Sequence, residues 1–127
     1  MATVAFLPYK VSALYGAHQT LGAQWVEEGE WRLPKSFADP AVEAERVRQS
    51  VGLQDVSAIG KLDLKGREVE RLLAGAAPPD HLSVLRLRPD HVLILTLPGR
   101  QGQVAEGLLQ VLSRTSCCAH LTDVTSA

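Results

Sequence analysis

A five-residue pattern, Leu-x-Asp-Val-Ser/Thr, occurs twice in this chain and constrains its architecture more than any other feature. The two copies are Leu53–Ser57 and Leu121–Thr125, which lie 68 positions apart (121 minus 53). The first copy runs on into residues that predict a strand, a glycine turn and a helix. Self-similarity at a fixed spacing is the signature of a repeated architecture. The pattern therefore predicts half of a duplicated arrangement, in which the second copy is only the first element of the next half.

Size and charge exclude several classes of protein. A chain of 127 residues makes one domain and buries about two-thirds of its unfolded surface. The net charge of −1 and the scattered basic residues give no basic face for nucleic acid, and no apolar run approaches the roughly 20 residues of a membrane span. The first ten residues lack the charged lead of a secretory signal. Cys117 and Cys118 are adjacent, which is no disulfide framework, so we expect reduced thiols and a cytoplasmic protein.

Residues 12 to 52 carry signals for a helix, a hairpin and a second helix. Ser12 can cap a helix that continues to about Leu21. Asp39-Pro40 places a capping carboxylate before a proline at the first helical position, and Gly52 is expected to end that helix. Between the helices, a turn rich in glutamate separates two short strands, Ala23–Val26 and Trp31–Leu33.

From Ile59 onward the hydrophobic pattern changes to period two, which predicts a half-buried strand up to Lys65. The later segments are expected to be a helix after Gly66, strands over 82–87 and 91–97, a helix over about 101–113 and a strand over 119–124. The order strand-helix-strand-strand-helix-strand is the split βαβ arrangement. We therefore predict an α+β fold: a ferredoxin-like antiparallel sheet with helices on one face, plus an N-terminal helix-hairpin-helix extension.

The same residues resemble a known family. Three ordered stretches carry the resemblance: Ser12-x-Leu14-Tyr15-x-x-His18-x-x-Leu21-Gly22-Ala23, Trp31-x-x-Pro34, and Glu45-x-x-Arg48-x-x-Val51-Gly52-Leu53-x-Asp55-Val56-Ser57-x-x-Gly60-Lys61. They are similar to the N-terminus of the folate-binding aminomethyltransferases, which include the glycine cleavage T-protein and the folate domains of sarcosine and dimethylglycine dehydrogenases. Residues 85–94 resemble the family's strand-turn-strand, and more closely the gamma subunit of heterotetrameric sarcosine oxidase.

Two departures from the family concern its site. Full-length members insert a hairpin that ends in Gly-Gly-x-x-Asp-Asp before the strand at Leu82, and this chain lacks it. Asp80 corresponds either to that Asp-Asp pair or to an earlier Asn-Asp at the helix exit, and the sequence does not separate the two alignments. The family's Val-Asn-Ala after the buried strand is replaced by Leu97-Pro98-Gly99.

The resemblance implies tetrahydrofolate as the cofactor, and it implies the residues that would meet it. Ser57, Ala58 and Ile59 resemble the stretch that borders the folate. Transfer of a one-carbon unit needs a carboxylate near the reacting nitrogen, and Asp80 is the candidate catalytic residue and a candidate cofactor-binding residue. An acid that follows two prolines is more commonly a surface loop residue, so both interpretations of Asp80 stay open.

Other polar and aromatic residues favour structural roles. Asp55 is expected to accept backbone N–H bonds in its turn, as Asp123 would in the second copy. His18 is expected to be a core histidine bonded to backbone, because one histidine without suitably spaced partners is no metal site. Tyr15 and the two tryptophans are expected to be packing residues, with stacking on a pterin as the alternative.

Two hypotheses for the function follow. In the first, the chain is a subunit that completes a one-carbon or methylamine-handling enzyme with a second aminomethyltransferase-like or dehydrogenase chain, or with a copy of itself. The segment Leu121–Ala127 would be the joint, because an unpaired edge strand seeks a partner. In the second, the chain is a non-catalytic structural or interaction module that has kept the scaffold of the family and lost folate binding. In neither do we expect nucleic acid, a membrane or a metal.

Overall fold

The computed structural model describes residues 9–75 and 81–125. The chain divides into two compact units, residues 1–56 and 57–127. Within the described ranges, no helix is both long enough and apolar enough to cross a membrane. The single domain that we predict for the whole chain stays a prediction.

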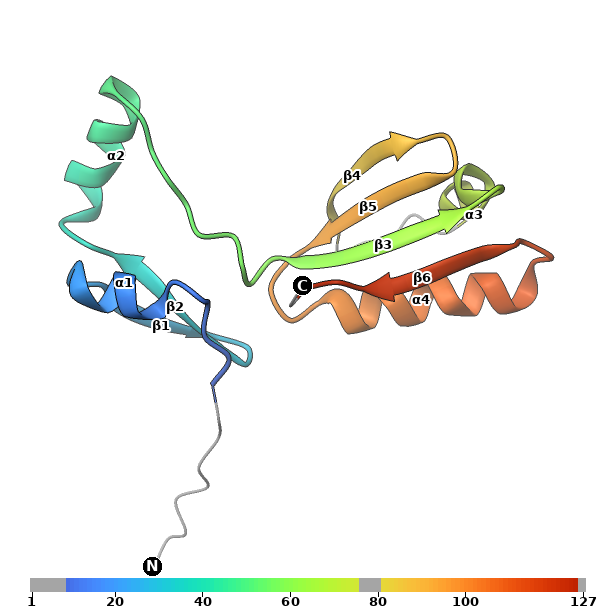
Figure 1. The fold of residues 1–127 in the computed structure, drawn as a ribbon, viewed down its shortest axis with the longest axis horizontal. Coiled ribbons are helices and arrows are strands. Elements are labelled where there is room, and N and C mark those ends of the chain that lie inside the picture. Colours follow the sequence, from blue (N-terminus) through green and yellow to red (C-terminus); the bar gives the residue numbers. More distant parts are fainter. Residues whose placement is uncertain (1–8, 76–80, 126–127) are drawn as a thin grey trace, which may run out of the picture. The chain divides into compact units, whose positions relative to one another are not determined.

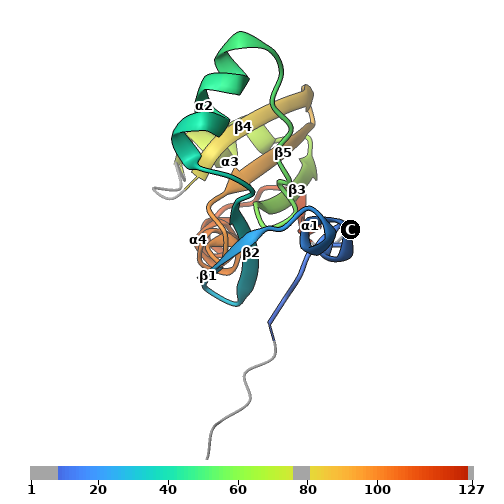
Figure 2. The same ribbon diagram turned by 90° about the vertical axis from the view of Figure 1, so that its left-hand side faces the viewer.

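The first unit contains α1 (Tyr15–Thr20), β1 (Gln24–Glu28), β2 (Trp31–Ser36) and α2 (Pro40–Gln49). The strands pair antiparallel across a tight turn at Gly29. Figure 2 shows the four elements, coloured along the chain from blue at α1 to blue-green at α2. Whether this unit forms an extension of the sheet domain stays a prediction.

Both helices of this unit differ from the prediction at one end. Helix α1 begins at Tyr15, because the Ser12 hydroxyl accepts from the Leu14 N–H at 2.9 Å and closes a turn before the helix. The predicted start of α2 is confirmed: the Asp39 carboxylate accepts from the Ala41 N–H at 2.8 Å, with proline at the first helical position. That helix ends at Gln49 rather than Gly52, because Ser50 has non-helical backbone angles.

The second unit contains the following elements: β3 (Gly60–Gly66), α3 (Val69–Gly75), β4 (His81–Arg88), β5 (His91–Thr96), α4 (Gln101–Arg114) and β6 (Ala119–Asp123). The strands lie in the order β4-β5-β3-β6, and every neighbouring pair is antiparallel (Figure 1). Each helix therefore joins two strands that have a third strand between them, which is the split βαβ connection. The predicted α+β class with an antiparallel sheet is confirmed.

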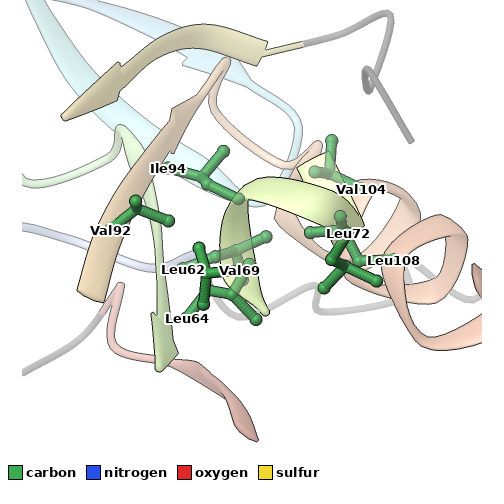
Figure 3. Close-up of a cluster of buried hydrophobic side chains, with 8 residues drawn as sticks. All are labelled: Leu62, Leu64, Val69, Leu72, Val92, Ile94, Val104 and Leu108. Atoms are coloured by element: carbon green, nitrogen blue, oxygen red, sulfur yellow. The ribbon is translucent and has the colours of Figure 1, made fainter. Parts of the chain in front are cut away.

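The core of this unit lies between one face of the sheet and both helices. Strand residues alternate between the two faces, so Leu62 and Leu64 of β3 point to the same side as Val92 and Ile94 of β5. Residues of α3 and α4 complete the cluster, and all of them appear in Figure 3: Val69, Leu72, Val104 and Leu108. The helices cover the same face because they contribute to one cluster. The opposite face carries Lys61, Asp63 and Lys65 of β3 opposite Leu95, Leu93 and His91 of β5.

Candidate functional site

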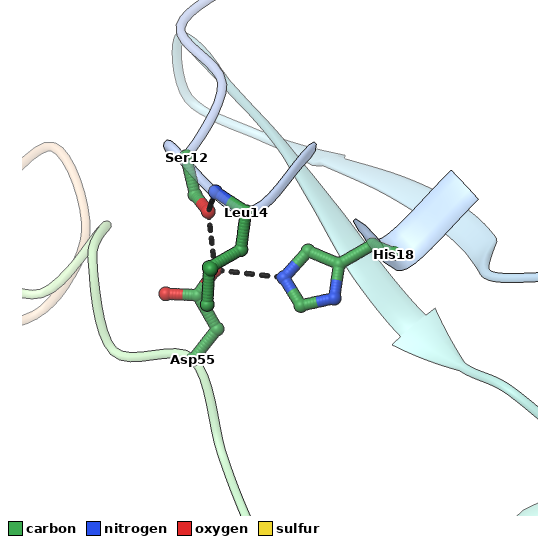
Figure 4. A network of polar contacts seen from close by, with 4 residues as sticks. All are labelled: Ser12, Leu14, His18 and Asp55. Atoms are coloured by element: carbon green, nitrogen blue, oxygen red, sulfur yellow. Dashed lines mark hydrogen bonds and ion pairs between the residues drawn. The ribbon is translucent and has the colours of Figure 1, made fainter. Parts of the chain in front are cut away.

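A buried polar network joins the start of the first unit to the segment that follows α2. Asp55 accepts a hydrogen bond from the Ser12 hydroxyl at 2.5 Å through its Oδ2 (Figure 4). The same oxygen lies 2.8 Å from Nε2 of His18. The side chains of His18 and Asp55 are only 11% and 7% exposed, so the carboxylate is held by directed donors in place of water.

The order of the three groups decides what this network can do. In a nucleophilic triad the imidazole lies between the hydroxyl and the carboxylate, so that it can take the hydroxyl proton. Here the carboxylate of Asp55 lies in the middle, and Ser12 and His18 both bind it. The network therefore fastens the chain before Ser57 to the region of α1 and does not activate Ser12.

The sequence did not predict this network. We expected a backbone partner for His18, and the structure gives its Nε2 the carboxylate of Asp55 instead. The residues are 37 and 43 positions apart in the two contacts, and no local pattern signals such a pairing. The parallel expectation for the second copy is confirmed, because Oδ1 of Asp123 accepts from the backbone N–H of Thr125 at 2.9 Å.

The predicted folate-bordering residues form a turn that leads into β3. Ala58 is buried, whereas Ser57 and Ile59 are half-buried. The ammonium of Lys61 donates to the carbonyl oxygen of Ile59 at 2.8 Å and lies 3.3 Å from that of Ser57. One side chain therefore holds two carbonyl groups of the turn.

The second copy of the repeated pattern is hydrogen-bonded to the start of β3 on the side of β6. The backbone N–H of Lys61 donates to the Thr125 hydroxyl at 3.1 Å, and its carbonyl accepts from the Val124 N–H at 2.8 Å. Thr125 is in turn bonded to Asp123, through its hydroxyl at 2.5 Å as well as its N–H. The first copy therefore precedes β3 in the chain, and the second copy is hydrogen-bonded to the start of this strand.

Next to the turn, three elements meet at one end of the sheet. A Cβ atom at Gly60 would lie 2.1 Å from the hydroxyl oxygen of Thr96 and 3.2 Å from Oε1 of Gln101. Thr96 has no exposed surface, so glycine is the residue that lets β3, β5 and α4 approach here. Oε1 of Gln101 is buried and has no hydrogen-bond partner among the residues that the structure describes. A buried acceptor without a donor is costly, and a ligand N–H is one group that would satisfy it.

A second polar cluster lies on the sheet face opposite the helices. Asp63 contacts Nζ of Lys65 at 2.9 Å and also accepts a hydrogen bond from His91. The hydrogen bond from Lys65 is the main cause that holds the pKa of Asp63 below its usual value, and the bond from His91 acts in the same direction. Within residues 9–75 and 81–125, no group of three histidines, cysteines or acids could hold a metal ion.

The other predicted residues are placed as follows. Asp80 lies outside the described residues. Trp31 is buried, as expected for a packing residue, and Tyr15 stacks on Trp25 with ring centroids 4.7 Å apart. The role of Lys61 was missed, because a lysine in a period-two strand reads as a solvated residue and nothing in the pattern shows its ammonium turning back on the preceding turn.

Known proteins are similar to this chain in sequence and in fold. Residues 14–81, more than half of the chain, match the family model described as GCVT N-terminal domain. A probable aminomethyltransferase from Halobacterium salinarum is 35% identical over 80 residues, which cover 63% of this chain and 21% of that protein. The aminomethyltransferase from Moorella thermoacetica is 34% identical over 104 residues, which cover 79% of this chain and 26% of that protein.

A solved structure gives the same fold. The crystal structure of glycine cleavage system aminomethyltransferase T from Bartonella henselae superposes with a TM-score of 0.67 at 18% identity, covering 89% of this chain and 38% of that one. This chain spans about a quarter of the length of the curated relatives that it matches. The chain therefore belongs to the aminomethyltransferase family and corresponds to the N-terminal portion of its members.

Proposed function

We propose that this chain forms one wall of a tetrahydrofolate site in a one-carbon-transfer protein. The observation that carries the proposal is the anchored turn Ser57–Ile59. In the family that the chain belongs to, the matching stretch borders the folate, and here Lys61 fixes its carbonyl groups while Thr125 fixes the strand behind it. A turn held from two sides offers a ligand a preformed surface, which lowers the entropy lost on binding.

The residues around this turn fit a pterin in two respects. Pterin sites are mostly apolar with a few directed hydrogen bonds, and the half-buried side chain of Ile59 supplies apolar surface. Oε1 of Gln101 has no hydrogen-bond partner among the described residues and lies buried at the same end of the sheet. A reduced pterin carries several N–H donors, one of which would reach this oxygen only if the side chain turned outward. We assign Asp80 the remaining role, which is to orient the reacting nitrogen of the cofactor and assist proton movement there.

A second chain would supply the rest of the site. This chain spans only about a quarter of its relatives, so most of what surrounds the cofactor in a full-length protein has no counterpart in it. The strand β6 lies at one edge of the sheet and pairs with β3 alone among the described strands. Such an edge exposes backbone groups that can pair with a further strand. We propose that a second aminomethyltransferase-like or dehydrogenase chain, or another copy of this one, adds there.

The competing function is a non-catalytic interaction module on the same scaffold. The observation in its favour is the loop Leu97-Pro98-Gly99, which stands where the family has Val-Asn-Ala and so offers no amide side chain. The missing hairpin with its Asp-Asp pair points the same way. Under either function we propose one domain over residues 1–127, with the helix-hairpin-helix segment as its N-terminal extension. We place it in the cytoplasm, where the free thiols of Cys117 and Cys118 stay reduced.

Calorimetric titration of the purified chain with tetrahydrofolate, alone and mixed with candidate partner chains, separates the two functions. Micromolar binding that is weakened by Asp80→Asn supports the cofactor site. Absence of binding in every mixture leaves the interaction module.

A pair of truncations localises the cofactor. Ile59→Ala removes apolar surface from the turn and is expected to weaken binding up to about tenfold, which is about 1.4 kcal/mol. Leu109→Ala is the matched control, because Leu109 is 53% exposed on α4 and its truncation is expected to leave the affinity unchanged. Equal losses in both variants would argue against a site at the turn.

A further inference from the structure

We propose that Lys61 is a positioning residue, whose ammonium sets the conformation in which the turn Ser57–Ile59 meets its ligand. The inference rests on the proposed function for the identity of that ligand, tetrahydrofolate. It rests on the contacts of Lys61 for everything else.

The ammonium acts on two peptide planes at once. It lies 3.3 Å from the carbonyl oxygen of Ser57 and 2.8 Å from that of Ile59. Because a peptide unit is planar, a fixed carbonyl also fixes the N–H group of the next residue. Lys61 therefore constrains the direction of the N–H group of Ala58 and acts on that of Gly60, a residue that also pairs with Thr96 of β5.

The base of the Lys61 side chain is itself immobile. Its residue belongs to β3, which lies inside the sheet and pairs with Leu95 of β5 on one side. On the other side its backbone is bonded to Val124 and Thr125. A charged donor on a fixed base makes stronger hydrogen bonds than a neutral or mobile one, because less freedom is lost in forming them.

The same strand provides a matched control. Lys65 lies four positions further along β3, so it points to the same face as Lys61. Its ammonium binds Asp63 at 2.9 Å, and its side chain is 58% exposed. Replacing Lys65 removes the same charge from the same face and leaves the turn untouched.

Amide hydrogen exchange, read residue by residue by NMR, tests the positioning role in Lys61→Met and Lys65→Met. We expect protection of the Ala58 and Gly60 amides to fall about tenfold in Lys61→Met and to stay within twofold of wild type in Lys65→Met. Lys61→Arg keeps a charged donor and is expected to recover part of the protection. Unchanged protection in Lys61→Met, or an equal fall in Lys65→Met, overturns the inference.

Titration with tetrahydrofolate tests the consequence for binding. We expect Lys61→Met to lose about tenfold in affinity and Lys65→Met to lose less than twofold. A loosened turn with unchanged affinity would mean that Lys61 serves stability only, which overturns the positioning role. If the wild-type chain and its mixtures bind no tetrahydrofolate, the proposed function fails, and the exchange comparison alone then decides whether Lys61 sets the turn.

Discussion

Gly60 offers the sharpest test of the packing that supports the candidate site. In Gly60→Ala the new Cβ atom would lie 2.1 Å from the Thr96 hydroxyl oxygen and 2.8 Å from Cβ of Gln101. Thr96 is fully buried and β-branched, so its side chain has little freedom to move away. Overpacking of this kind typically costs about 1–3 kcal/mol, and the lower chain entropy of unfolded alanine offsets about 0.4–1 kcal/mol of it. We expect Gly60→Ala to lower the free energy of unfolding by about 1–2 kcal/mol.

A double-mutant cycle isolates the collision. Thr96→Ala alone removes a methyl group and a hydroxyl that donates to the Leu97 carbonyl at 3.1 Å, which should cost about 1–2 kcal/mol. In the double variant the hydroxyl is gone, so the alanine at position 60 has room on that side. We therefore expect the double variant to be at least about 1 kcal/mol more stable than the sum of the two single changes predicts.

Urea unfolding followed by circular dichroism measures the three variants. Gly102→Ala is the control, because nothing lies within 4 Å of its Cβ position on α4, and it should be neutral or stabilising by up to about 1 kcal/mol. Additive losses from Gly60→Ala and Thr96→Ala, within about 0.5 kcal/mol, would refute the packing described here.

Three further perturbations test other parts of the structure. Asp55→Ala removes the shared acceptor of the buried network and is expected to lower the free energy of unfolding of the first unit by about 2–4 kcal/mol. Fluorescence of Trp25 and Trp31 reports on this change, because both residues lie in that unit. A loss below about 1 kcal/mol would contradict the burial of the Asp55 carboxylate. Asp63 has a lowered pKa in the folded state, so its contribution is present above the unfolded pKa of about 3.9 and is lost as the pH falls through the folded value. Asp63→Asn should therefore lower the free energy of urea unfolding by about 0.5–1 kcal/mol at pH 7 and leave it unchanged once Asp63 is protonated. A difference between the two proteins that does not depend on pH would show that the Asp63 charge is not its cause. Gln101→Leu removes a buried oxygen that has no partner among the described residues, so thermal unfolding of the free chain should show equal or higher stability while tetrahydrofolate binding weakens. A loss of stability above about 1 kcal/mol would mean that the oxygen has a partner in the folded chain.

The parts of the fold that could be predicted are those that local chemistry determines. The Asp39 cap and its proline place the start of α2 because both act within one helical turn. The period-two pattern places β3 because a half-buried strand must alternate. The split order of strands and helices then follows from the sequence of elements, since short connections leave few topologies.

The parts that could not be predicted depend on residues far apart in the chain. Asp55 and Asp123 occupy the same place in the repeated pattern, yet Asp123 binds Thr125 locally and Asp55 binds Ser12 and His18 across about 40 positions. Which partner a carboxylate finds depends on what the fold brings near it, and that information is absent from the local pattern.

NMR chemical-shift mapping with tetrahydrofolate is the most direct test of the claim that this chain carries part of a folate site. We expect saturating cofactor to shift the resonances of the backbone amides of Ala58, Ile59 and Gly60 and of the side-chain amide of Gln101. The amide resonances of Asp63, Lys65 and His91, on the sheet face opposite the helices, should stay unchanged. Perturbations confined to other parts of the chain, or none at millimolar cofactor with every partner chain tried, would contradict it.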